Sequence, residues 1–275
     1  MKLVLKLGGT LLEESQDRQR IVAQIASCIA AGHRILLVHG GGKRLTRFLD
    51  AMGVRSHFVN GLRVTTAEAL DGVVKVFAGT VNHELLADCY ALGLPAVGIS
   101  GVDGGCLLAE KLVGDQGEDW GFVGRITNAN PAVWESLLDA GYLPVMACIA
   151  VGKGGQIYNV NADQAAAACA VHWRADALVL LTDVDGVQDR EGRVVPRLAP
   201  EEIPTLLASG AVAGGMLAKL HAVQEALARE VSRVFICNGR RDGVLEAILT
   251  AQETDSGGAP WGTLIGATQS IGKEK

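Results

Sequence analysis

The stretch Val4-Leu5-Lys6-Leu7-Gly8-Gly9-Thr10 indicates the fold class. Here an apolar run carries a lysine near its end and breaks directly into two glycines. That pattern is expected of a buried strand that presents a cation and then opens its backbone. A second apolar run, residues 34–39, ends in Gly40-Gly41-Gly42 before a predicted helix. Because backbone N–H groups at such junctions lie at the positive end of a helix dipole, the two stretches predict an α/β protein that handles phosphate.

The composition supports many such junctions and excludes several other classes of protein. Glycine accounts for 35 of the 275 residues, roughly double the usual share of about 7%, whereas aromatic residues make up only 4%. The net charge of −5 gives no general attraction for nucleic acid or for an anionic membrane. Six scattered cysteines without a Cys-x-x-Cys pair predict reduced thiols. The lack of a signal peptide and of an apolar run of about 18 residues predicts a cytoplasmic protein.

Repeated alternation of strands and helices predicts a three-layer α/β/α sandwich with a mainly parallel central sheet. Apolar runs such as 177–182 do not alternate with polar residues, as expected where helices cover both faces of a sheet. A capping box, Thr65-Thr66-Ala67-Glu68, predicts one long helix over about 66–92. Short alternating segments from 106 to 125 predict β-hairpins, and residues 143–151 predict one buried strand.

Common catalytic signatures are absent from the sequence. Gly42-Lys43 is followed by Arg44, so the P-loop pattern is not met, and no Gly-x-Gly-x-x-Gly follows the first strand. Segment 98–102 fails the Gly-x-Ser-x-Gly pattern because its fifth residue is valine. The six histidines lack metal-ligand spacing, and segment 183–186 is too short for a calcium loop. These absences weaken the hydrolase, metalloenzyme and dinucleotide-binding oxidoreductase interpretations, and no metal ligand is predicted.

Single residues remain ambiguous when each is taken alone. Lys6 could be a solvated lysine at a strand end, and Arg63 a solvated loop arginine. Asp163 could simply complement the dipole of an alanine-rich helix, in whose first turn it falls. Lys219 could be an ordinary exposed helix lysine. The triple glycine 40–42 favours a ligand site more strongly, because it removes every side chain between the backbone and a ligand.

Taken together, six motifs follow one another in a recognisable order. They are Lys6-Leu7-Gly8-Gly9, His39-Gly40-Gly41-Gly42, Asn60-Gly61-Leu62-Arg63-Val64-Thr65, Asn159-Val160-Asn161-Ala162-Asp163, Thr182-Asp183-Val184-Asp185-Gly186 and Gly214-Gly215-Met216-Leu217-Ala218-Lys219. From residue 2 to about residue 266, the chain resembles the amino acid kinase superfamily, and most closely its N-acetylglutamate kinases. The third and fourth motifs are the most specific, because sister kinases carry relatives of the first.

This resemblance implies a role for each matching residue. Lys6 and Lys219 would be the two cations on the transferring phosphoryl group, and Asp163 the carboxylate that holds both. The acyl amino acid would be bound by Gly41, Gly42, Arg63 and Asn159, the last two at its α-carboxylate. The nucleotide-binding positions would be Gly8, Gly9, Asp183, Val184, Asp185, Gly186, Ala211, Val212, Ala213, Gly214 and Gly215.

The resemblance also implies a reaction and a domain organisation. One domain, 1–275, would have an N-lobe of about 1–174 for the acyl amino acid and dimerisation, and a C-lobe of about 175–268 for ATP. The enzyme would use ATP with Mg²⁺ to phosphorylate the γ-carboxylate of N-acetyl-L-glutamate, the second step of arginine biosynthesis. A γ-carboxylate with an ordinary pKa near 4.3 is ionised at neutral pH and needs no general base. Lysines and glycine N–H groups would offset the repulsion between the anions.

The expected assembly is a homodimer whose interface involves the predicted helix 66–92. Arginine-inhibited relatives carry an extra N-terminal helix, whereas the first strand here begins by residue 2, so we expect insensitivity to arginine. Two alternatives stay open. One is a sister carboxylate kinase acting on an aminoadipate derivative, because one methylene is worth only about 1–3 kcal/mol in a pocket. The other is a non-catalytic ligand sensor on the same fold, against which the joint presence of Lys6, Asp163 and Lys219 argues.

Overall fold

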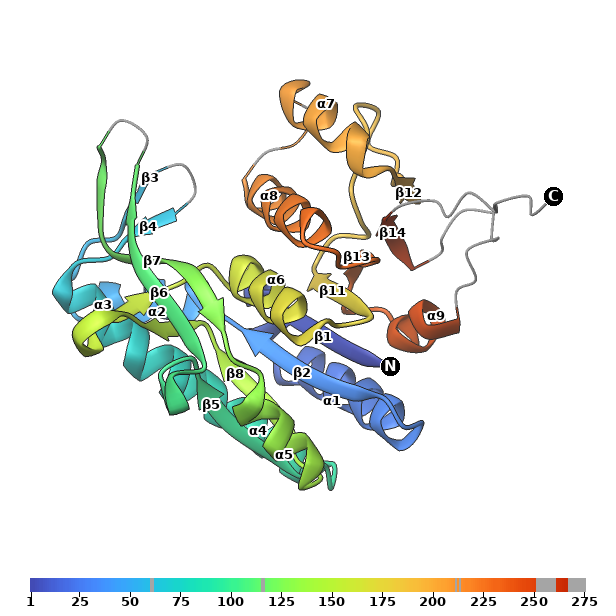
Figure 1. The fold of residues 1–275 in the computed structure, drawn as a ribbon, viewed down its shortest axis with the longest axis horizontal. Coiled ribbons are helices and arrows are strands. Elements are labelled where there is room, and N and C mark those ends of the chain that lie inside the picture. Colours follow the sequence, from blue (N-terminus) through green and yellow to red (C-terminus); the bar gives the residue numbers. More distant parts are fainter. Residues whose placement is uncertain (60–61, 115–116, 211, 213, 251–260, 267–275) are drawn as a thin grey trace.

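The structure is a computed structural model that describes residues 1–59, 62–114, 117–210, 212, 214–250 and 261–266. Within these residues an eight-stranded sheet crosses the molecule (Figure 1). Its strands, in spatial order, are β12 (Arg197–Leu198), β14 (Gly262–Ile265), β13 (Val234–Asn238), β11 (Ala177–Thr182), β1 (Lys2–Leu7), β2 (Arg34–His39), β8 (Leu143–Ala147) and β5 (Ala96–Ser100). The first strand of the chain therefore lies in the interior of the sheet.

The sheet is mostly parallel, which confirms the predicted α/β fold. β1 pairs in parallel with β2 on one side and β11 on the other, so that Lys6 lies opposite Val38 and Leu180. The exceptions are β14, which runs antiparallel to β13, and β12, which runs parallel to β14. The side chains of β1, β2 and β11 are almost all buried, as expected of strands covered on both faces.

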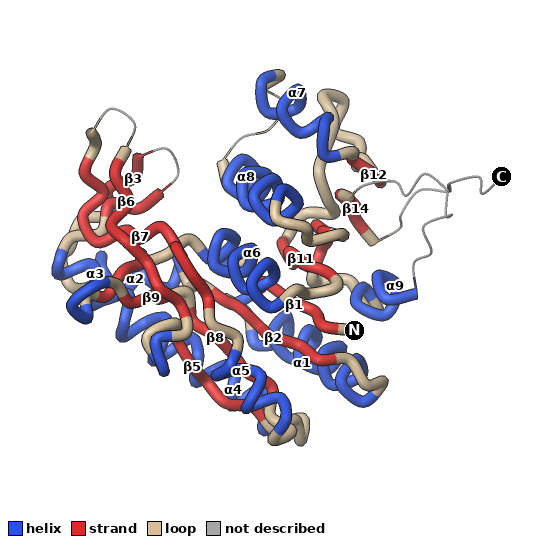
Figure 2. The backbone as a smooth tube through the Cα atoms, viewed as in Figure 1, coloured by secondary structure: helices blue, strands red, loops and turns tan. Residues whose placement is uncertain are grey.

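Helices pack on both faces of the sheet (Figures 1 and 2). The helices in chain order are α1 (Ser15–Ala30), α2 (Gly42–Ala51), α3 (Ala67–Val73), α4 (Asn82–Ala91), α5 (Ala132–Asp139), α6 (Ala162–Trp173), α7 (Ile203–Ala208), α8 (Gly215–Ala228) and α9 (Val244–Thr250). α1 packs against α4 and α9, whereas α6 packs against β1 and α8. The buried alanines 165–168 leave little side-chain volume on α6, which lets this helix approach both neighbours closely. None of the helices in the described part of the chain is long and apolar enough to cross a membrane.

The segment predicted as one long helix, 66–92, is helical over 67–91 in the structure but changes helix type within that range. Thr66, one residue later than the Thr65 of the predicted capping box, caps it, and its side chain accepts a hydrogen bond from the N–H of Ala69. After α3, however, the chain forms a π-helix, η2 (Val74–Val81), before α4 begins. The wider turns place Phe77 and Val81 against Gly41, where an added Cβ would lie 3.0 and 3.1 Å from these side chains. The predicted long helical stretch is therefore confirmed, but its middle part is π-helical, which the sequence pattern did not predict.

A small closed barrel of strands lies beside the main sheet. It contains β6 (Leu107–Val113), β7 (Asp119–Ala129), β9 (Ile149–Val151) and β10 (Ile157–Asn159), and a separate hairpin joins β3 (His57–Val59) to β4 (Leu62–Val64). The antiparallel pair β6–β7 confirms the predicted hairpin. The strand predicted over 143–151 is divided at Cys148, because β8 belongs to the main sheet and β9 to the small barrel.

Candidate active site

Three strands of the main sheet end side by side at one edge. β1 leads into Gly8-Gly9, β2 into Gly40-Gly41-Gly42, and β11 into Asp183. The carboxyl ends of parallel strands are the usual place for ligands in open α/β sheets. The two glycine loops are in contact, since a Cβ on Gly9 would lie 3.8 Å from the backbone nitrogen of Gly42.

The structure brings the three charged residues predicted to be catalytic into one cluster. Lys6 Nζ lies 2.9 Å from Asp163 Oδ1, and Lys219 Nζ donates a hydrogen bond of 3.3 Å to Asp163 Oδ2. All three residues are buried, with exposed fractions of 6, 5 and 9% for Lys6, Asp163 and Lys219. One carboxylate thus holds two ammonium groups, which leaves the cluster with an excess of positive charge.

The fold positions this cluster from three separate elements. Lys6 lies near the end of the interior strand β1, and Lys219 lies one turn into α8. Asp163 lies in the first turn of α6, where the side chain of Asn161 caps the helix by accepting from the N–H groups of Asp163 and Gln164. Because α6 packs on both β1 and α8, its N-terminal carboxylate reaches both lysines.

Electrostatics keep the central carboxylate ionised. Burial raises the pKa of Asp163, but the charges of Lys6 and Lys219 and their hydrogen bonds outweigh burial and hold it below its usual range. Burial is the largest influence on Lys219 and, with the charge of Lys6, lowers its pKa against the opposing pull of Asp163. The two cations therefore repel each other, and an incoming polyanion would relieve that repulsion.

Two cavities adjoin the cluster, and Lys6 and Gly9 line both of them. The first cavity, of about 200 Å³, is called the acid cavity below. Its lining includes Gly40, Gly41, Gly42, Arg63, Phe77, Asn159 and Asp163. The second, of about 440 Å³, is called the nucleotide cavity. Its lining includes Gly8, Thr10, Thr182, Asp183, Val184, Gly186, Val212, Gly215, Met216 and Lys219. Because Lys6 lines both cavities, a group transferred from a ligand in one cavity to a ligand in the other would move past this lysine.

Two polar side chains in the lining of the acid cavity, Arg63 and Asn159, are fixed by hydrogen bonds. Arg63, on β4, donates to the Thr46 hydroxyl at 2.7 Å and to the Gly42 carbonyl at 3.3 Å, and its guanidinium lies 4.5 Å from the ring centre of Phe58. Asn159, at the end of β10, donates to the Thr65 hydroxyl at 3.0 Å. These contacts fix a cation and an amide beside the second glycine loop, an arrangement that suits a carboxylate ligand.

The nucleotide cavity contains most, but not all, of the predicted nucleotide-binding residues. Asp185 is absent from its lining, because the carboxylate of this residue accepts hydrogen bonds from Asn238 and Arg241. Gly214 also lies outside the lining and caps α8 with a positive φ of 57°. Ala211 and Ala213 lie outside the described residues.

Sequence reasoning missed several residues that line the two cavities. They are Leu45, Phe58, Phe77, Val123 and Cys148 in the acid cavity, and Thr10, Thr182, Gln188 and Met216 in the nucleotide cavity. The apolar residues carry no motif that distinguishes them from core residues. Thr10 could have been noticed, because it directly follows the glycines of the first strand.

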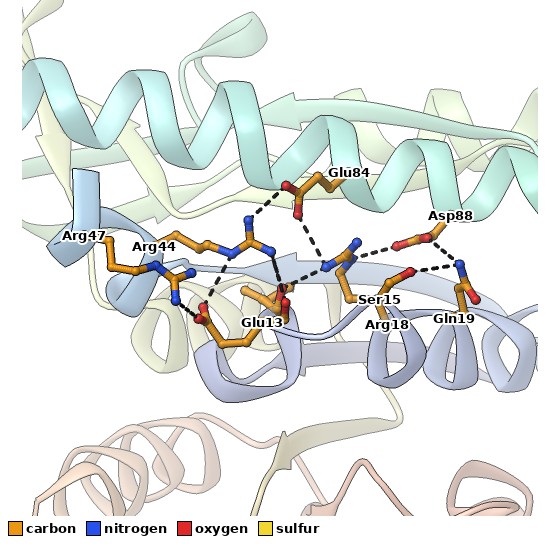
Figure 3. Close-up of polar contacts among 9 residues, drawn as sticks. Glu13, Ser15, Arg18, Gln19, Arg44, Arg47, Glu84 and Asp88 are labelled. Carbon is orange, nitrogen blue, oxygen red and sulfur yellow. Dashed lines mark hydrogen bonds and ion pairs between the residues drawn. The ribbon is translucent and has the colours of Figure 1, made fainter. Parts of the chain in front are cut away.

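An ion network behind the cavities ties the first glycine loop to two helices (Figure 3). Arg44 of α2 and Arg18 of α1 both donate to the carbonyl of Leu12, which ends the short 3-10 helix η1 (Gly9–Leu12). Both arginines also pair with Glu84 of α4, at 2.9 and 3.4 Å. Cations at a carbonyl terminus are favourable, and here they fix η1 relative to the helix that follows the second glycine loop.

No three histidine, cysteine, aspartate or glutamate side chains among the described residues are grouped as a metal site would require. The six cysteines are all buried and free. Burial raises the pKa of Cys148, the thiol that lines the acid cavity, to about 12. This thiol is therefore protonated at neutral pH and is a poor nucleophile.

Comparison with known proteins agrees with the geometry of the site. The family model of the amino acid kinase family matches residues 1–238. The acetylglutamate kinase of Solibacter usitatus is 49% identical over 253 residues, which cover 92% of this chain and 97% of that protein. The acetylglutamate kinase of Acidobacterium capsulatum is 43% identical over 255 residues, with coverages of 93% and 97%.

A solved structure has a similar fold. N-acetylglutamate synthase from Neisseria gonorrhoeae, complexed with coenzyme A and N-acetyl-glutamate, superposes with a TM-score of 0.83 at 31% identity. The match covers 97% of this chain but only 59% of that one. The resemblance seen in the sequence is thus confirmed over nearly the whole length, and the chain belongs to the amino acid kinase family.

Proposed function

We propose that this protein transfers the γ-phosphoryl group of ATP to the γ-carboxylate of N-acetyl-L-glutamate, a step of arginine biosynthesis. The relatives named acetylglutamate kinase that match nearly the whole chain support this activity. The observation that carries the proposal is the meeting of two cavities at Lys6, beside the cluster with Asp163 and Lys219. One cavity ends in a buried arginine and an amide, and the other is lined by glycines from two strand ends.

In this proposal the acyl amino acid occupies the acid cavity. Arg63 and Asn159 bind its α-carboxylate, and the N–H groups of Gly41 and Gly42 also bind the acyl amino acid. The γ-carboxylate then points toward Lys6. Because a carboxylate is ionised at neutral pH, the chemical step needs no general base. The residues of the site contribute orientation and positive charge.

ATP occupies the nucleotide cavity, with its phosphates at the N–H groups of Gly8 and Gly9. A Cβ at Gly8 would lie 2.8 Å from the Leu181 carbonyl, so a side chain here would push the backbone away from the strand end. Lys6 and Lys219 stabilise the charge on the transferring group, and Asp163 keeps both ammonium groups aligned. Asp183, Val184 and Gly186 line this cavity, whereas Asp185 lies outside it.

We propose that Mg²⁺ accompanies ATP. Mg²⁺ commonly keeps several water ligands and binds phosphates together with few protein carboxylates. The nucleotide cavity offers the carboxylate of Asp183, which fits such an ion. When bound, the ion would neutralise charge on the nucleotide phosphates.

The proposed enzyme is a cytoplasmic homodimer with two lobes, about 1–174 for the acid and about 175–268 for ATP. Six free cysteines suit a reducing compartment. The end of α4 supports an interface there, because Tyr90 is 87% exposed and Leu92 is 45% exposed. Sedimentation of wild type and a Tyr90→Glu variant tests the dimer, since a charge buried in an interface would shift the protein toward the monomer.

A kinase assay tests the reaction. Wild type should form a hydroxylamine-trappable acyl phosphate from N-acetylglutamate and ATP, and should form less from the longer aminoadipate analogue. Lys6→Met should lower kcat by about 100- to 1,000-fold with a smaller change in KM. Lys75→Met is the control, because this exposed lysine pairs with Asp71 on the same helical segment, away from both cavities. Near-wild-type kcat in Lys6→Met would refute the proposed role, and absence of acyl phosphate would refute the function.

A further inference from the structure

A buried polar pair lies directly behind the second glycine loop. His39, the last residue of β2, is fully buried, and Asn82, the first residue of α4, is 2% exposed. His39 Nδ1 lies 2.9 Å from the Gly40 carbonyl, and its Nε2 lies 3.0 Å from Asn82 Nδ2. Neither residue is among those that line the two cavities. A histidine buried this completely can act on the site only through its neighbours.

The contacts determine which ring nitrogen carries the proton. Asn82 Nδ2 lies 2.9 Å from the Val145 carbonyl, which can only accept, so this atom is the amide nitrogen. Its second N–H then faces Nε2 of His39, which must accept and is unprotonated. The proton of the neutral ring is therefore on Nδ1 and is donated to the Gly40 carbonyl. Burial lowers the pKa of His39 to about 4, so the ring is neutral at physiological pH.

This hydrogen bond sets the orientation of the next peptide group. The peptide bond between Gly40 and Gly41 is trans, as are the others in the described residues, and in a trans peptide the C=O and N–H groups point in opposite directions. With the Gly40 carbonyl held against the imidazole, the N–H of Gly41 points away from it. Gly40 and Gly41 both line the acid cavity. Among the described residues, no backbone carbonyl accepts a hydrogen bond from the Gly41 N–H.

We propose that His39 is a positioning residue: through the Gly40 carbonyl it aims the N–H of Gly41 at the substrate carboxylate in the acid cavity. Asn82 fixes the ring for this task by selecting the tautomer and tying it to β8. The inference rests on the proposed function, because it assigns the donor to N-acetylglutamate. It predicts that disturbing His39 weakens the acid's binding and leaves ATP binding unchanged.

The tautomer can be tested without any substrate. In protein labelled with ¹⁵N-histidine, the His39 ring should show a protonated Nδ1 and an unprotonated Nε2 at pH 7, and Asn82→Leu should change this signature. A ring protonated at Nε2 in the wild type would overturn the inference. Since this readout requires no turnover, it holds even if the kinase assay fails.

Steady-state kinetics test the positioning. His39→Asn keeps an amide N–H close to the position of Nδ1 and should retain the wild-type KM for N-acetylglutamate within about threefold. His39→Leu removes the donor and should raise that KM by about tenfold, the value of roughly one hydrogen bond, with the KM for ATP unchanged. His83→Leu is the matched control: its Nδ1 also lies 2.9 Å from a glycine carbonyl, that of Gly79, but on the exposed face of α4. It should behave as wild type.

The outcomes separate this inference from the proposed function. An inactive wild type refutes the function alone. An active wild type with an unchanged KM for the acid in His39→Leu refutes the inference alone. If His39→Leu fails to fold, Asn82→Leu replaces it, because this variant leaves the imidazole in place but frees the ring. An unchanged KM for the acid in Asn82→Leu would likewise count against the inference.

Discussion

Replacing Asp163 by asparagine would leave two buried ammonium groups without a shared counter-ion. In the wild type, Lys6 and Lys219 lie 2.9 and 3.3 Å from the two carboxylate oxygens, and all three residues are at most 9% exposed. An amide of the same size keeps the packing but cannot neutralise either cation. The substitution thus isolates the charge of Asp163 from its volume.

The expected loss of stability is large. Removing one partner from a buried ion pair costs about 3–5 kcal/mol, and for a chain of this size that corresponds to a fall in Tm on the order of 5–10 °C. A bound polyphosphate supplies negative charge at the same place. ATP or pyrophosphate should therefore raise the Tm of Asp163→Asn more than that of wild type.

Thermal unfolding with and without pyrophosphate measures both effects. Asp88→Asn is the matched control, because Asp88 is also buried and pairs with Arg18 at 2.7 Å, but away from the cavities. It should lower Tm without any added rescue by the anion. A Tm for Asp163→Asn within about 2 °C of wild type, or equal rescue of all three proteins, would refute the electrostatic account of the cluster.

Three further predictions follow from other parts of the structure. The folded pKa of His39, about 4, lies below the 6.5 of an unfolded histidine, so its stabilising contribution is complete above pH 6.5 and falls as the pH drops toward 4. Urea titrations should show wild type losing about 2 kcal/mol more than His39→Asn between pH 7.5 and 5; equal losses would contradict this. Gly98→Ala should destabilise by about 1–3 kcal/mol, because its Cβ would lie 1.8 Å from Asn82 Oδ1; an unchanged urea midpoint would argue against the close contact. Arg44→Met should raise the KM for ATP by loosening η1, whereas Arg47→Met, the exposed partner of Glu13, should not; equal KM values would show that the ion network does not position the loop.

Patterns read along short stretches predicted much of the fold. The strand–glycine junctions after Leu7 and His39 were recognisable because each needs only a buried run followed by residues without side chains. The sheet's parallel character followed from the same apolar runs. The π-helix 74–81 could not be predicted, because its wider turns depend on packing against Gly41, which is distant in the sequence.

Local sequence patterns alone did not predict which residues form the site. Lys219 has the pattern of an exposed helix lysine, yet it is 9% exposed because α8 packs against α6. Only the family resemblance brought it together with Lys6 and Asp163. The resemblance also suggested a binding role for Asp185, whose carboxylate the structure places against Arg241 instead.

The interior position of β1 has a consequence for folding during synthesis. The N–H of Lys2 bonds the side chain of Asp176, 174 positions later in the chain, and the whole strand pairs with β11 in this region. At a translation rate of about 5–20 residues per second, this pairing must wait on the order of 10–30 s after β1 is made. During that interval β1 can pair with β2 alone, and its other edge is open. Lys6, near the end of β1, places a charge within this mostly apolar strand, which discourages premature association with other chains while the enzyme is still being made.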